Sequence, residues 1–120
     1  MPSQIVIFIQ SNAKESHRAC EGIRIALGLA ACNLKVDLIL SSGASVLLTE
    51  DIEECIDGEL AKQYLSSLIK FIPTLYIENA GVGTPTADAV SHFQKEYQIV
   101  FLNPNEISKK ITLAECCIRL

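Results

Sequence analysis

Polar side chains follow three apolar runs of the sequence, and they are the first candidates for chemistry. The runs span Ile5 to Ile9, Leu34 to Leu40 and Thr74 to Ile77, and each is typical of a strand. If these strands are parallel, their carboxyl ends meet at one edge of the sheet, where open α/β sheets bind their ligands. We therefore predict a polar binding pocket at this edge. Its residues are Gln10, Ser11, Asn12, Ser41, Ser42, Glu78 and Asn79.

The five cysteines are the other residues with reactive potential. Their number is odd and no CxxC spacing occurs, so no disulfide scaffold is predicted and we expect a reducing, cytoplasmic location. Buried, inert cysteine is the commoner situation, because a nucleophilic thiol needs a lowered pKa. Cys20 is a candidate because His17 and Arg18 lie close in sequence, and Cys116 is a second candidate. Cys116 and Cys117 are adjacent, so a strand points them to opposite faces.

Composition argues against several classes of function. The net charge is −4 and the pI is about 5.1, so the chain lacks the basic surface that nucleic-acid binding requires. Six carboxylates lie between Glu50 and Glu59, but such runs are usually solvated surface, and neither of the two histidines has a ligand spacing. We predict no metal and no cofactor. The first apolar run, of five residues, is too short for a signal peptide or a membrane span, so no membrane association is expected.

Strand and helix signals alternate along the chain. The run from Ile5 to Ile9 leaves no face for water, which predicts a strand covered on both sides. Two further strands are expected at Ile99 to Leu102 and at Glu115 to Leu120. Helices are expected from Asn12 or Ser16 to Cys32, from Asp57 to Ile72, after Thr84 and Pro85, and after Asn103 with a capping box to Glu106. This order predicts one flavodoxin-like α/β domain over residues 1–120, with three layers, a five-stranded and mainly parallel sheet, and helices on both faces.

The first predicted helix is apolar on most of its sides. Gly22, Ala26 and Ala30 form a ridge of small residues that allows close approach to a sheet or another helix. The whole chain is 49% hydrophobic, with a mean hydropathy of +0.30, which is more apolar than a small monomer comfortably covers. We therefore expect an oligomer.

The order of these segments also resembles a known family. The resemblance rests on the stretches IVIFIQSN, CEGIRIALGLAA, KVDLILSSGASVLL, IPTLYIENAGV and YQIVFLNPNEISKKITLAECCIRL. Together they make nearly the whole chain similar to the DsrE/DsrF-like family, which includes the sulfur-relay subunits of tRNA 2-thiouridine synthesis. The resemblance implies homo- or hetero-oligomers, commonly trimers or hexamers of related subunits, and a persulfide carrier protein as a further partner. It also implies a sulfur-accepting cysteine after the strand Thr74 to Ile77, where this chain has Glu78.

Two functions of different classes follow from these observations. A carboxylate cannot carry a persulfide, so the first is a sulfur-relay subunit that serves as a structural or partner-docking component, or that uses another thiol such as Cys20 or Cys116. The second is a small-ligand-binding module that uses the polar pocket described above. A simpler role for Glu78 is to accept hydrogen bonds from loop backbone at a subunit contact. The sequence leaves the pathway open between tRNA thiolation, sulfur oxidation and neither.

Overall fold

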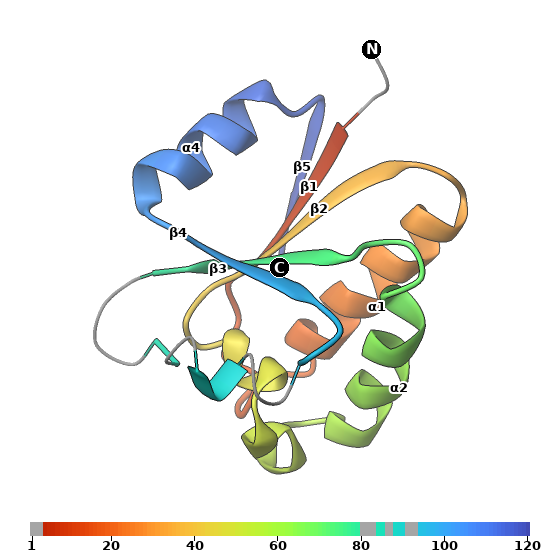
Figure 1. Cartoon of the computed structure of the whole chain (residues 1–120), viewed down its shortest axis with the longest axis vertical. Coiled ribbons are helices and arrows are strands. Elements are labelled where there is room, and N and C mark those ends of the chain that lie inside the picture. The colour runs from red at the N-terminus through yellow and green to blue at the C-terminus, as the bar shows by residue number, and fades with distance from the viewer. Residues whose placement is uncertain (1–3, 80–83, 86–87, 91–93) are drawn as a thin grey trace.

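The computed structural model describes residues 4–79, 84–85, 88–90 and 94–120. A five-stranded sheet forms its centre, and neighbouring strands are all parallel in the order β4-β3-β2-β1-β5 (Figure 1). The strands are β1 (Gln4–Ile9), β2 (Lys35–Leu40), β3 (Thr74–Glu78), β4 (Gln98–Leu102) and β5 (Cys116–Arg119). The helices are α1 (Arg18–Ala31), α2 (Gly58–Leu68), α4 (Pro104–Leu113) and two 3-10 helices, η1 (Ser45–Leu48) and η2 (Glu50–Glu54). The predicted flavodoxin-like, three-layer α/β class is confirmed.

The apolar run that begins the sequence is an interior strand, as predicted. β1 pairs with β2 on one side and with β5 on the other. Val6, Ile7 and Ile9 are fully buried. A parallel strand with neighbours on both sides and helices on both faces has no surface for polar side chains, which explains the unbroken apolar run.

Alternate side chains of β1 enter two separate hydrophobic cores. Ile7 and Ile9 belong to the larger core, which includes Ile23 of α1 and Leu65 of α2. Val6 and Phe8 belong to the smaller core, with Ile107 of α4. In Figure 1, α1 and α2 accordingly lie on one side of the sheet and α4 on the other. Successive strands from β1 to β4 step in one direction, whereas the connection through α4 returns across the sheet to β5, so right-handed crossovers place α4 on the opposite face.

Helix α1 begins later than the polar residues that were predicted to cap it. Its N-cap residue is His17, without a side-chain cap hydrogen bond. Asn12 and Ser16 instead accept hydrogen bonds from the backbone N–H groups of Lys14 and Arg18, so both shape the preceding loop. The predicted ridge of Gly22, Ala26 and Ala30 is buried, and Gly22 lies directly against Ile9 of β1. The absence of a side chain at position 22 lets the helix approach the sheet closely.

The six carboxylates of the acidic stretch are exposed, as predicted, but the stretch is folded and does not form an open connection. It folds into η2, and η1 and η2 together bury Leu47, Leu48 and Ile52 beneath the charged residues. Asp57, with a φ of 59°, then turns the chain into α2. This helix ends at Leu68, before the predicted end at Ile72. Turns at positions 69–71 then lead the chain to Pro73.

Local signals place the last helix correctly. The Asn103 side chain accepts a hydrogen bond from the Glu106 N–H, and the Glu106 carboxylate accepts one from the Asn103 N–H, which confirms the predicted capping box. In the helix predicted after Thr84 and Pro85, residues 88–90 are helical and Val90 is buried. Thr84 and Pro85 themselves are not helical, so the prediction that Pro85 opens the helix is wrong, and positions 86–87 and 91–93 lie outside the described residues. Among the described helices, none combines the length and the apolar character that a membrane crossing needs.

Candidate functional site

Three of the predicted pocket residues lie in one row at the carboxyl edge of the sheet. Ile9 is in register with Leu40, and Leu40 is in register with Ile77. Gln10, Ser41 and Glu78 are the next residues along these strands, so they occupy the same level on three adjacent strands. The ladder continues here, because the Ser41 N–H donates to the Ile9 carbonyl at 2.9 Å.

The row lies on the face of the sheet that α4 covers. Residues two apart in a strand share a face, and Gln10, Ser41 and Glu78 each follow a residue of the α4-side core by two positions. Those core residues are Phe8, Ile39 and Tyr76. Gln10 is exposed, Glu78 is partly buried and Ser41 is buried. The sequence therefore correctly predicted that these strand ends come together.

The other four predicted pocket residues stabilise the surrounding backbone. The Ser11 hydroxyl donates to the Leu120 carbonyl at 2.8 Å, and the Asn12 side chain accepts from the Lys14 N–H at 2.9 Å. The Ser42 carbonyl accepts from the Ser45 hydroxyl at 2.8 Å, and the Asn79 N–H extends the β3–β4 ladder to Leu102 at 2.8 Å. These bonds hold the loops next to the row.

Ser41 is the member of the row whose side-chain hydroxyl makes no hydrogen bond to any described residue. Its side chain is 9% exposed, and its Oγ atom has no hydrogen-bond partner among the described residues. A buried hydroxyl without a partner costs free energy, and such groups often accompany a function. The Ser41 hydroxyl is itself closed to solvent, so the Gln10 amide and the Glu78 carboxylate are the accessible polar groups of the row.

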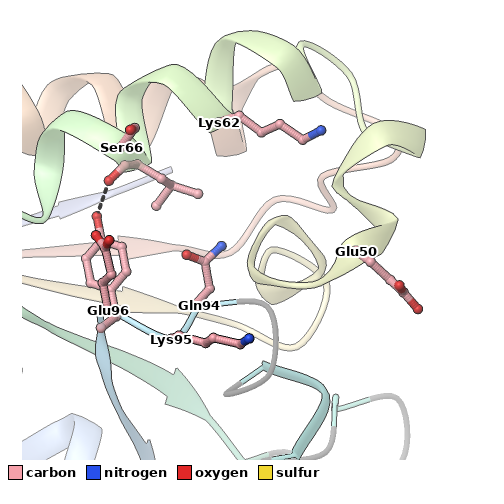
Figure 2. Close-up of a pocket in the computed structure, with 8 residues that line it drawn as sticks. Glu50, Lys62, Ser66, Gln94, Lys95 and Glu96 are labelled. Carbon is pink, nitrogen blue, oxygen red and sulfur yellow. Dashed lines mark hydrogen bonds between the residues drawn. The ribbon is translucent and has the colours of Figure 1, made fainter.

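A second hollow lies elsewhere, and no pattern in the sequence predicted it. A groove of about 550 Å³ runs between η2, α2 and residues 94–97. Figure 2 shows Lys62 and Ser66 on its α2 wall and Gln94, Lys95 and Glu96 on the opposite wall. Leu65 and Tyr97 form its floor, where the Tyr97 hydroxyl donates to the Leu65 carbonyl. Its charged residues are of both signs, and Lys62 is already paired with Glu53 at 3.0 Å, which raises the pKa of Lys62.

Comparison with known proteins adds a structural relative. The sequence matches no family model and no curated protein. The structure is similar to the crystal structure of the ychN protein from E. coli, with a TM-score of 0.69 over 98% of this chain and 99% of that chain. The fold is DsrE-like. The sequence identity is 15%, so the likeness concerns the fold alone.

Four of the five thiols divide into two groups by burial and position, and Cys117 is partly buried. Cys20 and Cys55 are both buried. Cys20 lies near the start of α1, and Cys55 directly follows η2. Burial, with the nearby charges of Asp57 and Glu21, raises the pKa of Cys20 to about 11, and Arg24 opposes this only in part. Burial also raises the pKa of Cys55. Cys32 and Cys116 are exposed, but Cys32 caps the end of α1 and Cys116 begins β5 beside Ile5, so both lie at the amino edge.

This division changes what can be expected of the two candidate thiols. His17 and Arg18, which suggested Cys20 as a candidate, are not among the charges that shift its pKa, and burial with two carboxylates raises that pKa. Cys116 is accessible but lies at the opposite edge of the sheet from Glu78. Among the described residues, no group of His, Cys, Asp and Glu is arranged to hold a metal ion.

Proposed function

We propose that the protein is a DsrE-like subunit of intracellular sulfur relay that docks a partner and does not itself accept sulfur. One observation carries the proposal. Glu78 ends β3, at the position where the resemblance implies an acceptor cysteine, and none of the five thiols is both exposed and at that edge of the sheet. The DsrE-like fold supports the assignment to this group of proteins.

The coverage of the sheet supports the docking role. Parallel sheets are normally covered on both faces. Among the described helices α4 alone lies on the second face, and Tyr76, Val100 and Cys117 remain only partly buried there. On α4 itself, Leu113 is 80% exposed. A related subunit, in a homo- or hetero-oligomer such as a trimer or hexamer, would cover this apolar surface.

Intact-mass spectrometry after incubation with a persulfide donor tests the non-acceptor role. In the reduced wild-type protein, no single cysteine is expected to accept a sulfur atom. No one Cys→Ser substitution should therefore change the mass gained. A Glu78→Cys variant is expected to gain one sulfur, because it places a partly exposed thiol at the strand end. Glu59→Cys, on the exposed surface of α2, is the control for accessibility, and an equal gain of sulfur there would mean that the reaction at position 78 reflects exposure alone. A wild-type gain that disappears in one Cys→Ser variant would replace this proposal with a relay protein that has a relocated acceptor.

Mixing of purified proteins tests the docking role separately. The chain is expected to form a complex with a thiol-bearing DsrE-like paralogue or with a persulfide carrier protein, and mass photometry of the mixture measures the mass of that complex. Leu113→Glu is expected to weaken that association, because it places a charge in the apolar surface. If the wild-type chain joins neither partner, the docking role is wrong.

The unpartnered Ser41 hydroxyl favours a second candidate, a small-ligand-binding module at the row of Gln10, Ser41 and Glu78. In this role Glu78 would accept hydrogen bonds from the guest. Thermal shift screening against polar metabolites tests it, with Ser41→Ala and Glu78→Gln as the informative variants. If Glu78→Gln changes neither assembly nor any ligand-induced shift in Tm, this candidate loses its support.

A further inference from the structure

Strands β2 and β3 separate towards their amino ends. β1 and β2 are in register over all six residues of each strand, and β3 and β4 over all five. β2 and β3 pair only at Ile39 with Tyr76 and at Leu40 with Ile77. The first four residues of β2, Lys35–Leu38, therefore have no partner strand on that side, and Figure 1 shows β2 curving away from β3.

The separation creates a polar cleft of about 420 Å³ that closes where the two strands meet. Val36 and Ile72, which line it, pack in the core under α1 and α2, whereas Tyr76, also in its lining, packs against the core under α4. The cleft thus enters the sheet between the strands, and its inner end is blocked. A blocked cleft of this size suits a small molecule or a chain end, because a continuous segment has no way through.

One wall of the cleft carries a side-chain network that is already ordered. Asp37 accepts hydrogen bonds from Gln4 and from Lys110, and the Lys110 ammonium lies 4.3 Å from the centre of the Tyr76 ring. The charge of Asp37 is therefore compensated within the fold. Lys35, also in the lining, is exposed and has no hydrogen-bond or ion-pair partner among the described residues. The uncompensated charge of the cleft is positive.

The rim of the cleft is apolar. Phe71 is 48% exposed and Leu34 is 40% exposed, which makes them two of the most exposed large hydrophobic residues in the described chain. The cleft thus combines a cation, a free strand edge with its N–H and C=O groups, and two apolar side chains. In a ligand, an anion would pair with the cation, a planar amide would hydrogen-bond to the strand edge, and an apolar group would contact the two apolar side chains.

We propose that this cleft binds a small carboxylate that also carries an amide and an apolar side chain, the chemistry of an N-acylated amino acid. The carboxylate pairs with Lys35, the amide bonds to the free edge of β2, and the side chain covers Phe71 and Leu34. The same chemistry occurs in a free acylated amino acid and at the carboxyl end of a peptide. The inference stands apart from the proposed sulfur relay, because capture of this guest involves no thiol.

Backbone amide NMR titration of the whole chain tests the proposal, with N-acetyl-leucine as the probe. Chemical-shift changes are expected at Lys35–Leu38, Phe71 and Thr74–Tyr76. N-acetyl-leucinamide, which lacks the carboxylate, is expected to bind about fivefold more weakly or worse. A hexapeptide ending in leucine separates the two sources: tighter binding than N-acetyl-leucine indicates a peptide end, and weaker binding indicates the free compound.

Matched variants make the outcome decisive. Lys35→Gln is expected to weaken N-acetyl-leucine binding about threefold to fivefold, the effect of one solvent-facing charge. Lys109→Gln, an exposed lysine on α4 outside the cleft, is the control and is expected to change nothing. The amide spectrum of each variant reports whether it is folded. Equal binding of the acid and its amide, or shift changes that map away from β2 and β3, would overturn the proposal.

Discussion

The Nζ atom of Lys110 lies 3.3 Å from Oδ2 of Asp37, and this ion pair joins α4 to an interior strand of the sheet. The two side chains are 28% and 19% exposed, so the pair is better shielded from solvent than an ordinary surface pair. Lys110 also packs over the Tyr76 ring. Because Ile107 is the only buried residue of α4, a polar contact of this kind is a substantial part of what holds the helix in place.

Lys110→Met is therefore expected to lower the free energy of unfolding by about 1–2 kcal/mol, between the values for exposed and for buried pairs. Urea denaturation near neutral pH measures the change. Lys109→Met is the control, because Lys109 is exposed on the same helix, and its effect is expected to stay within about 0.5 kcal/mol. Equal effects of the two substitutions would show that the ion pair contributes nothing.

The same pair has a defined pH dependence. Burial lowers the pKa of Lys110, but the Asp37 charge, together with Tyr76, outweighs burial and raises the pKa above its usual 10.5. A raised pKa in the folded state means that the stabilisation is complete below pH 10.5 and is lost as the pH rises through the raised value. The stability difference between wild type and Lys110→Met should therefore shrink in strongly alkaline buffer, measured by the same urea titrations. A difference that grows with pH would contradict this assignment.

Local signals predicted much of the fold, and they failed where distant residues decide the structure. The capping box of Asn103 and Glu106 depends on neighbouring residues, so the start of α4 was readable from the sequence. The end of α2 was not, because Phe71 continues the apolar spacing of the helix but is 48% exposed, beyond the last turn. In the acidic stretch, Ile52 is buried against the core. No local pattern in the sequence predicts that burial.

Gly22 and Gly28, on the same helix, form a matched pair for testing how closely α1 approaches the sheet. A Cβ atom on Gly22 would lie 2.6 Å from both Cγ1 and Cδ1 of Ile9, a fully buried residue that has little room to move. A Cβ atom on Gly28 would meet nothing within 4 Å. Gly22→Ala is therefore expected to destabilise the fold by about 1–3 kcal/mol through overpacking.

Gly28→Ala is expected to stabilise the fold by about 0.5–1 kcal/mol, because alanine has the higher helix propensity. Thermal unfolding of both variants beside the wild type measures the two changes, and opposite signs are expected. Two substitutions of the same sign would mean that the packing of α1 against β1 differs from the one described.

The candidate site was predictable only as far as strand ends could be located. Placing Gln10, Ser41 and Glu78 together needs no more than three parallel strands in order. The bond from Ser11 to Leu120 spans 109 positions, and the contact of Asp37 with Lys110 spans 73. Such partners depend on strand order and register across the sheet, so neither the hydrogen bond that Ser11 makes nor the cleft beside Asp37 was visible in the sequence.

Thiol reactivity is expected to follow burial in the native protein. With a pKa of about 11, Cys20 is ionised about a hundredfold less than an ordinary cysteine at mildly alkaline pH, and its burial restricts access further. Iodoacetamide should therefore modify Cys32 and Cys116 first, and Cys20 and Cys55 last, as followed by peptide mass spectrometry. In urea the four rates should converge. Early modification of Cys20 in the native protein would show that α1 opens readily.

Tyr97 directly precedes β4, and its hydroxyl makes a hydrogen bond to the backbone of α2. The hydroxyl donates to the Leu65 carbonyl, and the side chain is 8% exposed. The Leu65 carbonyl also accepts from the Ile69 N–H at 3.4 Å, so removal of the hydroxyl does not leave it without a partner. Tyr97→Phe is therefore expected to cost about 0.5–1.5 kcal/mol of unfolding free energy near neutral pH.

Burial, with the nearby charge of Glu96, raises the pKa of Tyr97 above its usual 10.0, so the folded state keeps the phenol protonated. That preference stabilises the fold fully below pH 10.0 and is lost as the pH rises through the raised value. Tyr97→Phe, which has no proton to lose there, should lose less stability in alkali than the wild type does. Urea titrations across that pH range measure the difference, with Tyr64→Phe as the control because Tyr64 is only partly buried. Parallel alkaline losses in wild type and Tyr97→Phe would mean that Tyr97 ionises as freely in the folded protein as in the unfolded chain.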